Sequence, residues 1–381
     1  MRLYSPDDEY CRLSPEDLSI VRKDEEITDT VPEEKPVSFF KDAAIRFAKN
    51  KASITALIVI LIIAFFAAFG PDMNDFSFKE QHPDYINMPP YIPALSGLGI
   101  FDGSYVLQNR RMDALSDPAK YPNDCVLEVM DEREVRGVMM CDVRVNYYKY
   151  MDAPQDLAFW FGSDYLGRDL WTRMWRGARV SLLIAVLSVL SNVFIGIIYG
   201  SIAGYYGGRT DMIMMRITEI IGAMPNLVMV TLFIMFFGAG ILSIVLALLL
   251  QNWIGTARMI RAQFYRYKGY EYVLAARTLG VKDRSLIFRH ILPNAIGPII
   301  TRAMVAIPGA IFTESFLAYL GLGIQAPETS IGILLADGQK VLQQFPSQVL
   351  FPSVLISVLM VAFNLLSNGL RDAFDPTQSG T

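Results

Sequence analysis

Long apolar runs separate the charged parts of this chain. Five regions approach or exceed the roughly 20 apolar residues that a helix needs to cross a bilayer core about 30 Å thick. They are residues 52–70, 178–206, 220–257, 296–320 and 348–370. Because a backbone in lipid must satisfy its hydrogen bonds internally, each run predicts membrane-spanning helix. The pattern predicts an all-α polytopic membrane protein.

The third apolar run is about twice as long as one crossing. No charged residue occurs from Ile220 to Ala257, and a Gly-Ala-Gly stretch at 238–240 lies near its middle. This pattern predicts two helices joined by a tight turn, which brings the total to six spans. We expect the first of the two to begin near Met212, with Arg216 and Glu219 at its membrane entrance.

Basic residues near the span ends predict the orientation of the chain. The loop 258–296 is the most basic part of the second half and is predicted to be cytoplasmic. Its basic residues are Arg258, Arg261, Arg266, Lys268, Arg277, Lys282, Arg284 and Arg289. The parity of the spans then makes the N-terminal tail (1–50) and the C-terminal tail (377–381) cytoplasmic. The first span is 51–70, and residues 178–376 form a core of five further spans.

Residues 71–177 are predicted to lie outside the cell as an insertion between the first two spans. Four arginines cluster where this region meets the second span, on the predicted outer side, against the usual excess of basic residues on the cytoplasmic side. They alternate with apolar residues such as Trp171 and Trp175. The arginines are Arg168, Arg173, Arg176 and Arg179. Such a pattern is typical of a helix that lies along the membrane interface.

Short β-prone runs within residues 80–155 predict a small β-rich part of the insertion. Cys125 and Cys141 flank one predicted hairpin. On an oxidising face they can form a disulfide or remain two free thiols, and the sequence leaves both open.

Composition excludes several functions. Hydrophobic residues make up 52% of the 381 residues and charged residues 19%, which is too apolar for an ordinary soluble protein. Three cysteines and two histidines leave little for a metal site or a nucleophilic pair. No phosphate-binding loop of the Gly-x-x-x-x-Gly-Lys-Ser/Thr type occurs, so ATP-driven work needs another polypeptide. No metal, cofactor or enzymatic reaction is expected in this chain, and nothing indicates nucleic-acid binding.

The polar stretch "EYVLAARTLGVKDRSLIFRHILPN" (271–294) interrupts the apolar second half. Residues 271–279 predict a short helix, Gly280 a turn, and Asp283 the cap of a second helix that Pro293 ends. Isoleucine and phenylalanine side chains of the second helix, Phe288 included, are expected to anchor it to the spans. The residues by themselves fit either a bracket that another protein contacts or a plain interfacial connector.

This stretch resembles the EAA loop of permease subunits of bacterial ABC importers. The matching residues are Glu271, Ala275, Ala276, Gly280, Ile287, Leu292 and Pro293, with the acidic residue further from the alanines than in the strict pattern. The resemblance implies a coupling helix that docks on an ATPase subunit. The residues expected to couple are Glu271, Ala275, Ala276, Gly280, Val281 and Asp283.

Four more stretches resemble the C-type permeases of oligopeptide and dipeptide importers. They are "FGSDYLGRDLWTRMWRGARVSL" (161–182), "GYYGGRTDMIMMR" (204–216), "ESFLAYLGLGIQAPETSIGILLADG" (314–338) and "AFNLLSNGLRDAFDP" (362–376). The resemblance implies the type I importer fold and oligopeptide import across a bacterial inner membrane. Dipeptide, nickel or glutathione import remain alternatives. The implied partners are a second permease, two ATPase subunits that bind ATP and Mg²⁺, and a substrate-binding protein.

Charged residues inside spans are costly and tend to face partners or water. Arg302 and Glu314 both fall in the fifth span and, with Arg216 and Glu219, are expected at the pathway or subunit interface. A structural ion pair is the alternative for Arg302 and Glu314, but their spacing exceeds three helical turns. Gly196, Gly200 and Gly204 form a small-residue face for helix packing or, secondarily, for subunit association.

Two other classes of function remain. A channel or secondary transporter working alone would need embedded acidic or histidine relays, of which this chain offers mainly Glu314. A membrane receptor would depend on the insertion, residues 80–155, as its working part.

Overall fold

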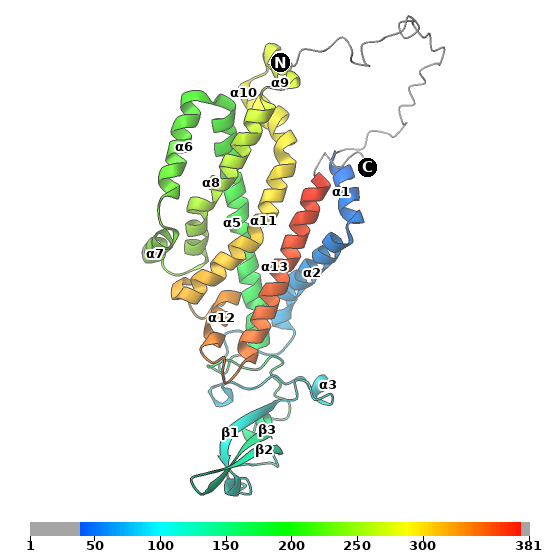
Figure 1. Ribbon diagram of the computed structural model, residues 1–381, viewed down its shortest axis with the longest axis vertical. Coiled ribbons are helices and arrows are strands. Elements are labelled where there is room, and N and C mark those ends of the chain that lie inside the picture. The colour runs from blue at the N-terminus through cyan, green and yellow to red at the C-terminus, as the bar shows by residue number, and fades with distance from the viewer. Residues whose placement is uncertain (1–38, 375–381) are drawn as a thin grey trace, which may run out of the picture. The chain divides into compact units, whose positions relative to one another are not determined.

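The computed structural model describes residues 39–374, most of which are helical (Figure 1). The helices are α1 (Phe39–Lys49), α2 (Lys51–Phe69), α3 (Pro93–Ser96), α4 (Tyr147–Tyr150), α5 (Leu170–Tyr206), α6 (Gly208–Gly222), α7 (Asn226–Phe237), α8 (Ile241–Tyr267), α9 (Glu271–Thr278), α10 (Asp283–Ser285), α11 (Ile296–Leu317), α12 (Ile331–Gln339) and α13 (Ser347–Phe374). The contacts described below lie within residues 43–374, which belong to one compact unit. Residues 1–38 of the predicted N-terminal tail and the tail 377–381 fall outside the described residues.

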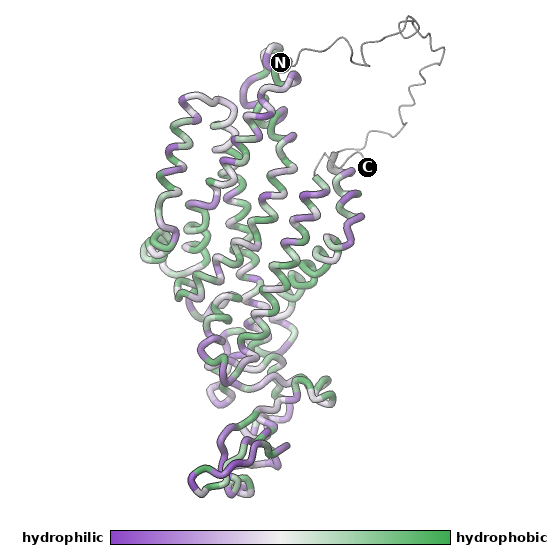
Figure 2. Tube along the Cα trace, viewed as in Figure 1, coloured by the Kyte–Doolittle hydropathy of each residue, from purple (hydrophilic) through white to green (hydrophobic). Residues whose placement is uncertain are grey.

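Five helical segments of the described chain are long and apolar enough to cross a membrane. They are Lys51–Asp72, Leu170–Tyr206, Ile241–Tyr267, Asp283–Leu322 and Ser347–Phe374. Hydrophobic residues cover them along most of their length (Figure 2). The prediction of an all-α membrane protein with a small β-rich insertion is confirmed, and the span count is five, or six if one broken helix pair counts as a span.

That broken pair consists of α6 and α7, which are bent by 79° relative to each other. Pro225 precedes α7 and lacks the N–H that would continue α6, so the helix breaks there. The Gln251 side chain on α8 donates to the carbonyls of Ile221 (3.1 Å) and Met224 (2.6 Å) at the break. It thus satisfies the Met224 carbonyl, which the break in the helix leaves without a backbone donor, and adds a second partner to the Ile221 carbonyl. The Gly-Ala-Gly turn is confirmed, because α7 ends at Phe237 and α8 begins at Ile241.

Helix α5 corrects the predicted interfacial helix. It runs without interruption from Leu170 to Tyr206, so the four arginines sit at or near the start of a spanning helix. Trp175 is buried in the main apolar core, and Arg179 Nε donates to the Ala67 carbonyl at 2.7 Å. The alternation of arginine and apolar residues therefore reflects contacts with other parts of the chain, which hydropathy cannot reveal.

The glycine face of α5 packs against α8. A Cβ atom at Gly196 would lie 2.7 Å from Thr256 Cγ2, one at Gly200 would lie 2.9 Å from Ile260 Cβ, and one at Gly204 would lie 2.6 Å from Phe264 Cβ. Real Cβ atoms essentially never come this close to such neighbours. The three glycines therefore serve helix packing within the chain, as in other membrane helix pairs with small residues at the contact.

Replacing Gly200 with leucine should separate α5 from α8. We expect the detergent-solubilised protein to lose several degrees of melting temperature or to fail to fold, because overpacking typically costs about 1–3 kcal/mol or more. Gly240→Leu is the control, since no atom lies within 4 Å of its added Cβ and its backbone is extended. Equal melting temperatures for the two variants would contradict the close contact.

The β-rich insertion is a three-stranded antiparallel sheet with strand order β1-β3-β2. The strands are β1 (Ser104–Arg111), β2 (Val126–Val135) and β3 (Val138–Asn146). Arg136 and Gly137 form the two-residue turn of the β2–β3 hairpin, and both have positive φ, which suits the right-handed twist of the strands. The sheet runs from Ser104 to Asn146 and thus lies within the predicted range 80–155.

The two cysteines of the insertion are free thiols in one buried cluster. Cys125 directly precedes Val126, which is paired with Val145, whereas Cys141 lies four residues before Val145 on β3. Cys125 is thus opposite Asn146, five residues from Cys141, and at about 3.3 Å per residue the two Cα atoms lie roughly 16 Å apart, more than twice what a disulfide spans. Of the two alternatives, the structure therefore has the free thiols.

Burial raises the pKa of both thiols, so both should react slowly with maleimide in the folded protein. After denaturation without a reductant, we expect both to be labelled in full, as measured by mass spectrometry. Protection of the pair until a reductant is added would show a disulfide and contradict this arrangement.

Candidate coupling site

The segment that links α8 to α11 (residues 268–295) forms the two-helix element that its sequence predicts. Glu271 begins α9, where its charge favours the positive end of the helix dipole. Gly280 follows with φ of +79°, a conformation that side chains resist. A second helical stretch begins at Asp283.

The second stretch differs from the prediction at both ends. Lys282 rather than Asp283 occupies the cap position, and the Asp283 carboxylate instead accepts a hydrogen bond from Tyr205 Oη at 2.5 Å. Pro293 does not end the helix. A π-helical turn (Leu286–Ile291) and a 3₁₀ turn (Leu292–Ala295) lead directly into α11, and the proline sits in the first turn of the 3₁₀ stretch, where its missing N–H is not required.

The inner face of the segment is packed into the helix bundle. Val273 is fully buried and Ala276 nearly so, on the side of α9 that faces the core. They join one apolar cluster with residues of α5, α8 and α11. Its buried members are Tyr205, Ile260, Phe264, Val273, Ala276, Leu286, Ile287, Ile291, Ala295 and Ile299. Movement of α9 therefore has to be accompanied by movement of these helices.

Polar contacts hold the same segment at its start and its middle. Lys268 Nζ donates to the Gly204 carbonyl at the end of α5 at 3.0 Å, and burial lowers the pKa of this ammonium. The guanidinium of Arg277 lies over the Tyr205 ring, 5.4 Å from its centroid. The Tyr205–Asp283 hydrogen bond adds a third contact with α5. Both sides of the Gly280 turn are thus tied to one helix end.

The outer face of the segment exposes apolar side chains beside basic ones. Leu274 is 46% exposed, Leu279 84% and Phe288 43%. A surface cavity of about 500 Å³ is lined by Lys282, Arg284, Ser285, Phe288 and Arg289. Exposed apolar residues surrounded by polar ones are typical of protein-binding surfaces. The expectation that Phe288 anchors the segment internally is wrong.

The predicted coupling residues divide between the two faces. Glu271, Ala275, Gly280 and Asp283 are exposed and Val281 is half-buried, whereas Ala276 faces the core. Of the paired alanines, only Ala275 is therefore available to a partner.

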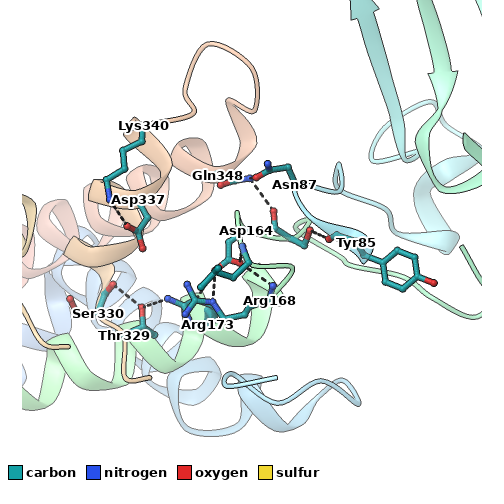
Figure 3. A network of polar contacts seen from close by, with 12 residues as sticks. Tyr85, Asn87, Asp164, Arg168, Arg173, Thr329, Ser330, Asp337, Lys340 and Gln348 are labelled. Carbon is teal, nitrogen blue, oxygen red and sulfur yellow. Dashed lines mark hydrogen bonds and ion pairs between the residues drawn. The ribbon is translucent and has the colours of Figure 1, made fainter. Parts of the chain in front are cut away.

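The signature "GSDYLGRD" (162–169) builds a second polar site, at the opposite end of α5 (Figure 3). Asp164 accepts from Arg168 Nε at 2.7 Å and from two backbone N–H groups, and Arg173 Nε lies 3.4 Å from the same carboxylate. Arg173 is 1% exposed, and its Nη2 reaches Thr329 Oγ1 at 3.4 Å. A buried carboxylate thus compensates two buried arginines, as charges removed from water require.

The same signature ties the insertion to the last spanning helix. Gln348 of α13 donates to Asn87 Oδ1 at 2.8 Å and to the Ser163 carbonyl at 3.0 Å. Asp169 caps α5 by accepting from the Thr172 N–H at 2.8 Å, and burial raises the pKa of this carboxyl. Sequence reasoning noted the motif but missed this role, although arginines recurring around Asp164 at helical spacing were a usable signal.

Replacing Asp164 with asparagine should leave Arg168 and Arg173 buried without an anion. Removing one partner of a buried ion pair typically costs about 3–5 kcal/mol, so we expect a clear fall in melting temperature. Asp113→Asn removes an exposed pair with Arg111 and is the control, with no measurable change expected. Similar melting temperatures for both variants would contradict the role of Asp164.

The four charged residues predicted at the pathway or interface are not brought together. Glu314 is fully buried inside the chain and accepts from Ser181 Oγ at 2.9 Å. Arg302 forms no hydrogen bond or ion pair with Glu314 and instead lines a cavity between α5, α8 and α11. Arg216 and Glu219 form an exposed ion pair of 2.6 Å on α6.

Comparison with known proteins agrees with this arrangement. Residues 192–380 match the family of binding-protein-dependent transport system inner membrane components, and residues 38–90 match the N-terminal transmembrane domain of oligopeptide transport permease C. The oligopeptide permease OppC of Bacillus subtilis is 36% identical over 90% of this chain and 91% of that protein. The dipeptide permease DppC of the same organism is 47% identical over 58% and 70%, and OppC of Escherichia coli is 31% identical over 94% and 99%.

A solved structure of an inward-facing methionine ABC transporter covers 52% of this chain and 96% of its own, with a TM-score of 0.42 and 14% identity. That score is too low to transfer details. The spanning helices and the matched families define a multi-pass membrane permease of ABC importers, which is a transporter subunit rather than an enzyme. Within that class, the chain belongs to the family of C-type oligopeptide and dipeptide transport permeases.

Proposed function

We propose that this chain forms half of the translocation pathway of an ATP-driven oligopeptide importer. Relatives that match nearly its whole length carry the name of oligopeptide permeases. A dipeptide permease of Lactococcus lactis also matches nearly the whole length, and one of Bacillus subtilis is more similar over a shorter part, so import of dipeptides is the alternative within the same branch. Nickel and glutathione importers of the branch are further alternatives.

The proposed assembly contains a second, homologous permease and two ATPase subunits that bind ATP and Mg²⁺. A separate substrate-binding protein delivers the peptide. The family description, a binding-protein-dependent inner membrane component, supports a partner of this kind. Nucleic acid has no role.

The proposed orientation places the segment 268–295 and both termini in the cytoplasm of a bacterial cell, with the sheet outside. The basic residues of the segment support it, because cytoplasmic loops carry an excess of Lys and Arg. Figure 1 supports it as well, since α9 and the three strands lie at opposite ends of the spanning helices. Residues 178–376 then form the permease core and residues 71–177 the outer insertion, except that residues 170–177 already belong to α5.

One observation carries the coupling role: the inner face of α9 is fixed to three spanning helices while its outer face is exposed. Alternating access requires the helices to move between two arrangements, and a nearly complete shift takes about 5.5 kcal/mol. A partner that binds α9 can shift the equilibrium between the two arrangements. The apolar cluster around Val273 fixes α9 to the spanning helices, so α9 cannot move without them. A passive connector would not need this packing.

Replacing Ala275 with glutamate should block docking of the ATPase without disturbing the fold. The side chain is exposed, so insertion and melting temperature should remain unchanged. ATP-dependent peptide uptake in proteoliposomes should fall at least about tenfold, as expected when a contact at the centre of an interface is lost. ATPase subunits should also fail to co-purify with the variant.

Thr210→Glu is the control, because it adds the same charge at an exposed position of α6. It should retain uptake. Wild-type uptake by the Ala275 variant would refute the coupling role, and wild-type uptake without any ATPase chain would support a stand-alone transporter instead.

A further inference from the structure

A polar cavity of about 240 Å³ lies between α5, α8 and α11 in the membrane-spanning part of the chain. Its polar lining residues are Asn192, Asn252, Thr256, Arg302 and Thr313, and the others are small or apolar. The volume equals that of roughly eight molecules of liquid water, so the cavity can hold more than a bridging water. Arg302 and Asn252 are exposed, which shows that the cavity opens on the surface of the subunit.

Arg302 is a cation without an anion. Among residues 39–374 no hydrogen bond or ion pair is recorded for it, whereas Arg168, Arg173 and Arg261 each have a carboxylate partner. Gly255 on α8 makes room for the guanidinium, because a Cβ there would lie 2.8 Å from Nη2. An unpaired arginine inside a spanning segment is costly and typically marks a substrate path.

Asn192 supplies an independent observation from the opposite wall. Its side chain is 6% exposed and lines the cavity, yet its Oδ1 atom has no hydrogen-bond partner. A buried acceptor without a donor is unfavourable unless something enters to donate to it. The cavity therefore presents a cationic donor on one wall and, on the other, an amide whose Oδ1 atom has no partner and meets a ligand after rotation of the side chain.

We propose that this cavity binds the C-terminal residue of the transported peptide. The guanidinium of Arg302 holds the terminal carboxylate by charge-assisted hydrogen bonds, and Asn192 Oδ1 accepts from a main-chain N–H of the same residue. The proposal rests on the proposed peptide import and adds the group of the substrate that the membrane part recognises.

The position of the site favours a peptide over other anions. The α11 residues that line the cavity, from Arg302 to Thr313, lie about 9 to 26 Å into the span 296–320 and so around the middle of a bilayer core about 30 Å thick. Lipid headgroups lie at the interface and not at this depth. An acidic side chain of the sister permease could pair with Arg302 but carries no N–H for Asn192, so it satisfies only half of the site.

The test uses the complete transporter with its binding protein in proteoliposomes, and one peptide as the free acid and as its C-terminal amide. The measured quantity is the ratio of acid uptake to amide uptake below saturation. Arg302→Gln should lower this ratio about tenfold or more relative to wild type, as expected for loss of a hydrogen bond to a charged group. Arg302→Lys should retain most of it, because the charge remains.

Comparing ratios removes the preference of the binding protein, which is common to all variants. Arg258→Gln is the matched control and should leave the ratio unchanged, because Arg258 is exposed on α8 outside the cavity. The inference is overturned if Arg302→Gln leaves the ratio unchanged. It is also overturned if the variant fails to assemble with the sister permease and loses acid and amide uptake equally; in both cases the proposed peptide import stands. If the wild-type complex hydrolyses ATP but takes up neither the acid nor the amide, the proposed function itself is refuted.

Discussion

Helices α5 and α8 approach closely because Gly196, Gly200 and Gly204 present no side chain to the contact. In lipid, where burial of apolar surface gives no driving force between helices, such close packing is a main source of attraction. The approach also fixes which residues of α8 meet α5: Phe264 packs beside Gly204, and Lys268 reaches its carbonyl. The contact between α5 and α8 therefore determines the position at which the segment 268–295 begins.

Helix α5 connects the three polar features of the protein. At about 1.5 Å per residue its 37 residues extend roughly 55 Å, enough to cross the membrane and project beyond it. Arg173 near its start belongs to the buried ion pair with Asp164, Asn192 in its middle lines the cavity, and Tyr205 at its end holds Asp283. A displacement of α9 is consequently transmitted to the other two features through one rigid element.

The two polar ends differ in what surrounds their charges. Asp164 and its arginines are almost completely buried and mutually compensated, which favours a fixed junction between the insertion and the helices. The segment 268–295 keeps its basic side chains and Leu279 exposed, which leaves them free for a partner. Arg302, between these ends, is neither compensated nor fully exposed, and this intermediate state suits reversible contact with a passing substrate.

Periodicity and motif determined the spans, the turn at 238–240, the hairpin and the location of α9, because local propensity and the demands of the bilayer act on neighbouring residues. Contacts between distant residues decided the rest. Arg173 and Arg176 were interpreted as interfacial because their partners, Asp164 and Glu328, approach them only in the folded chain. Likewise, only tertiary structure shows that Phe288 points outward, that the cysteines lie too far apart to bond, and that Gly255 accommodates Arg302. The partner and the exposure of a side chain depend on its neighbours in the folded structure, and these neighbours can be distant in the sequence.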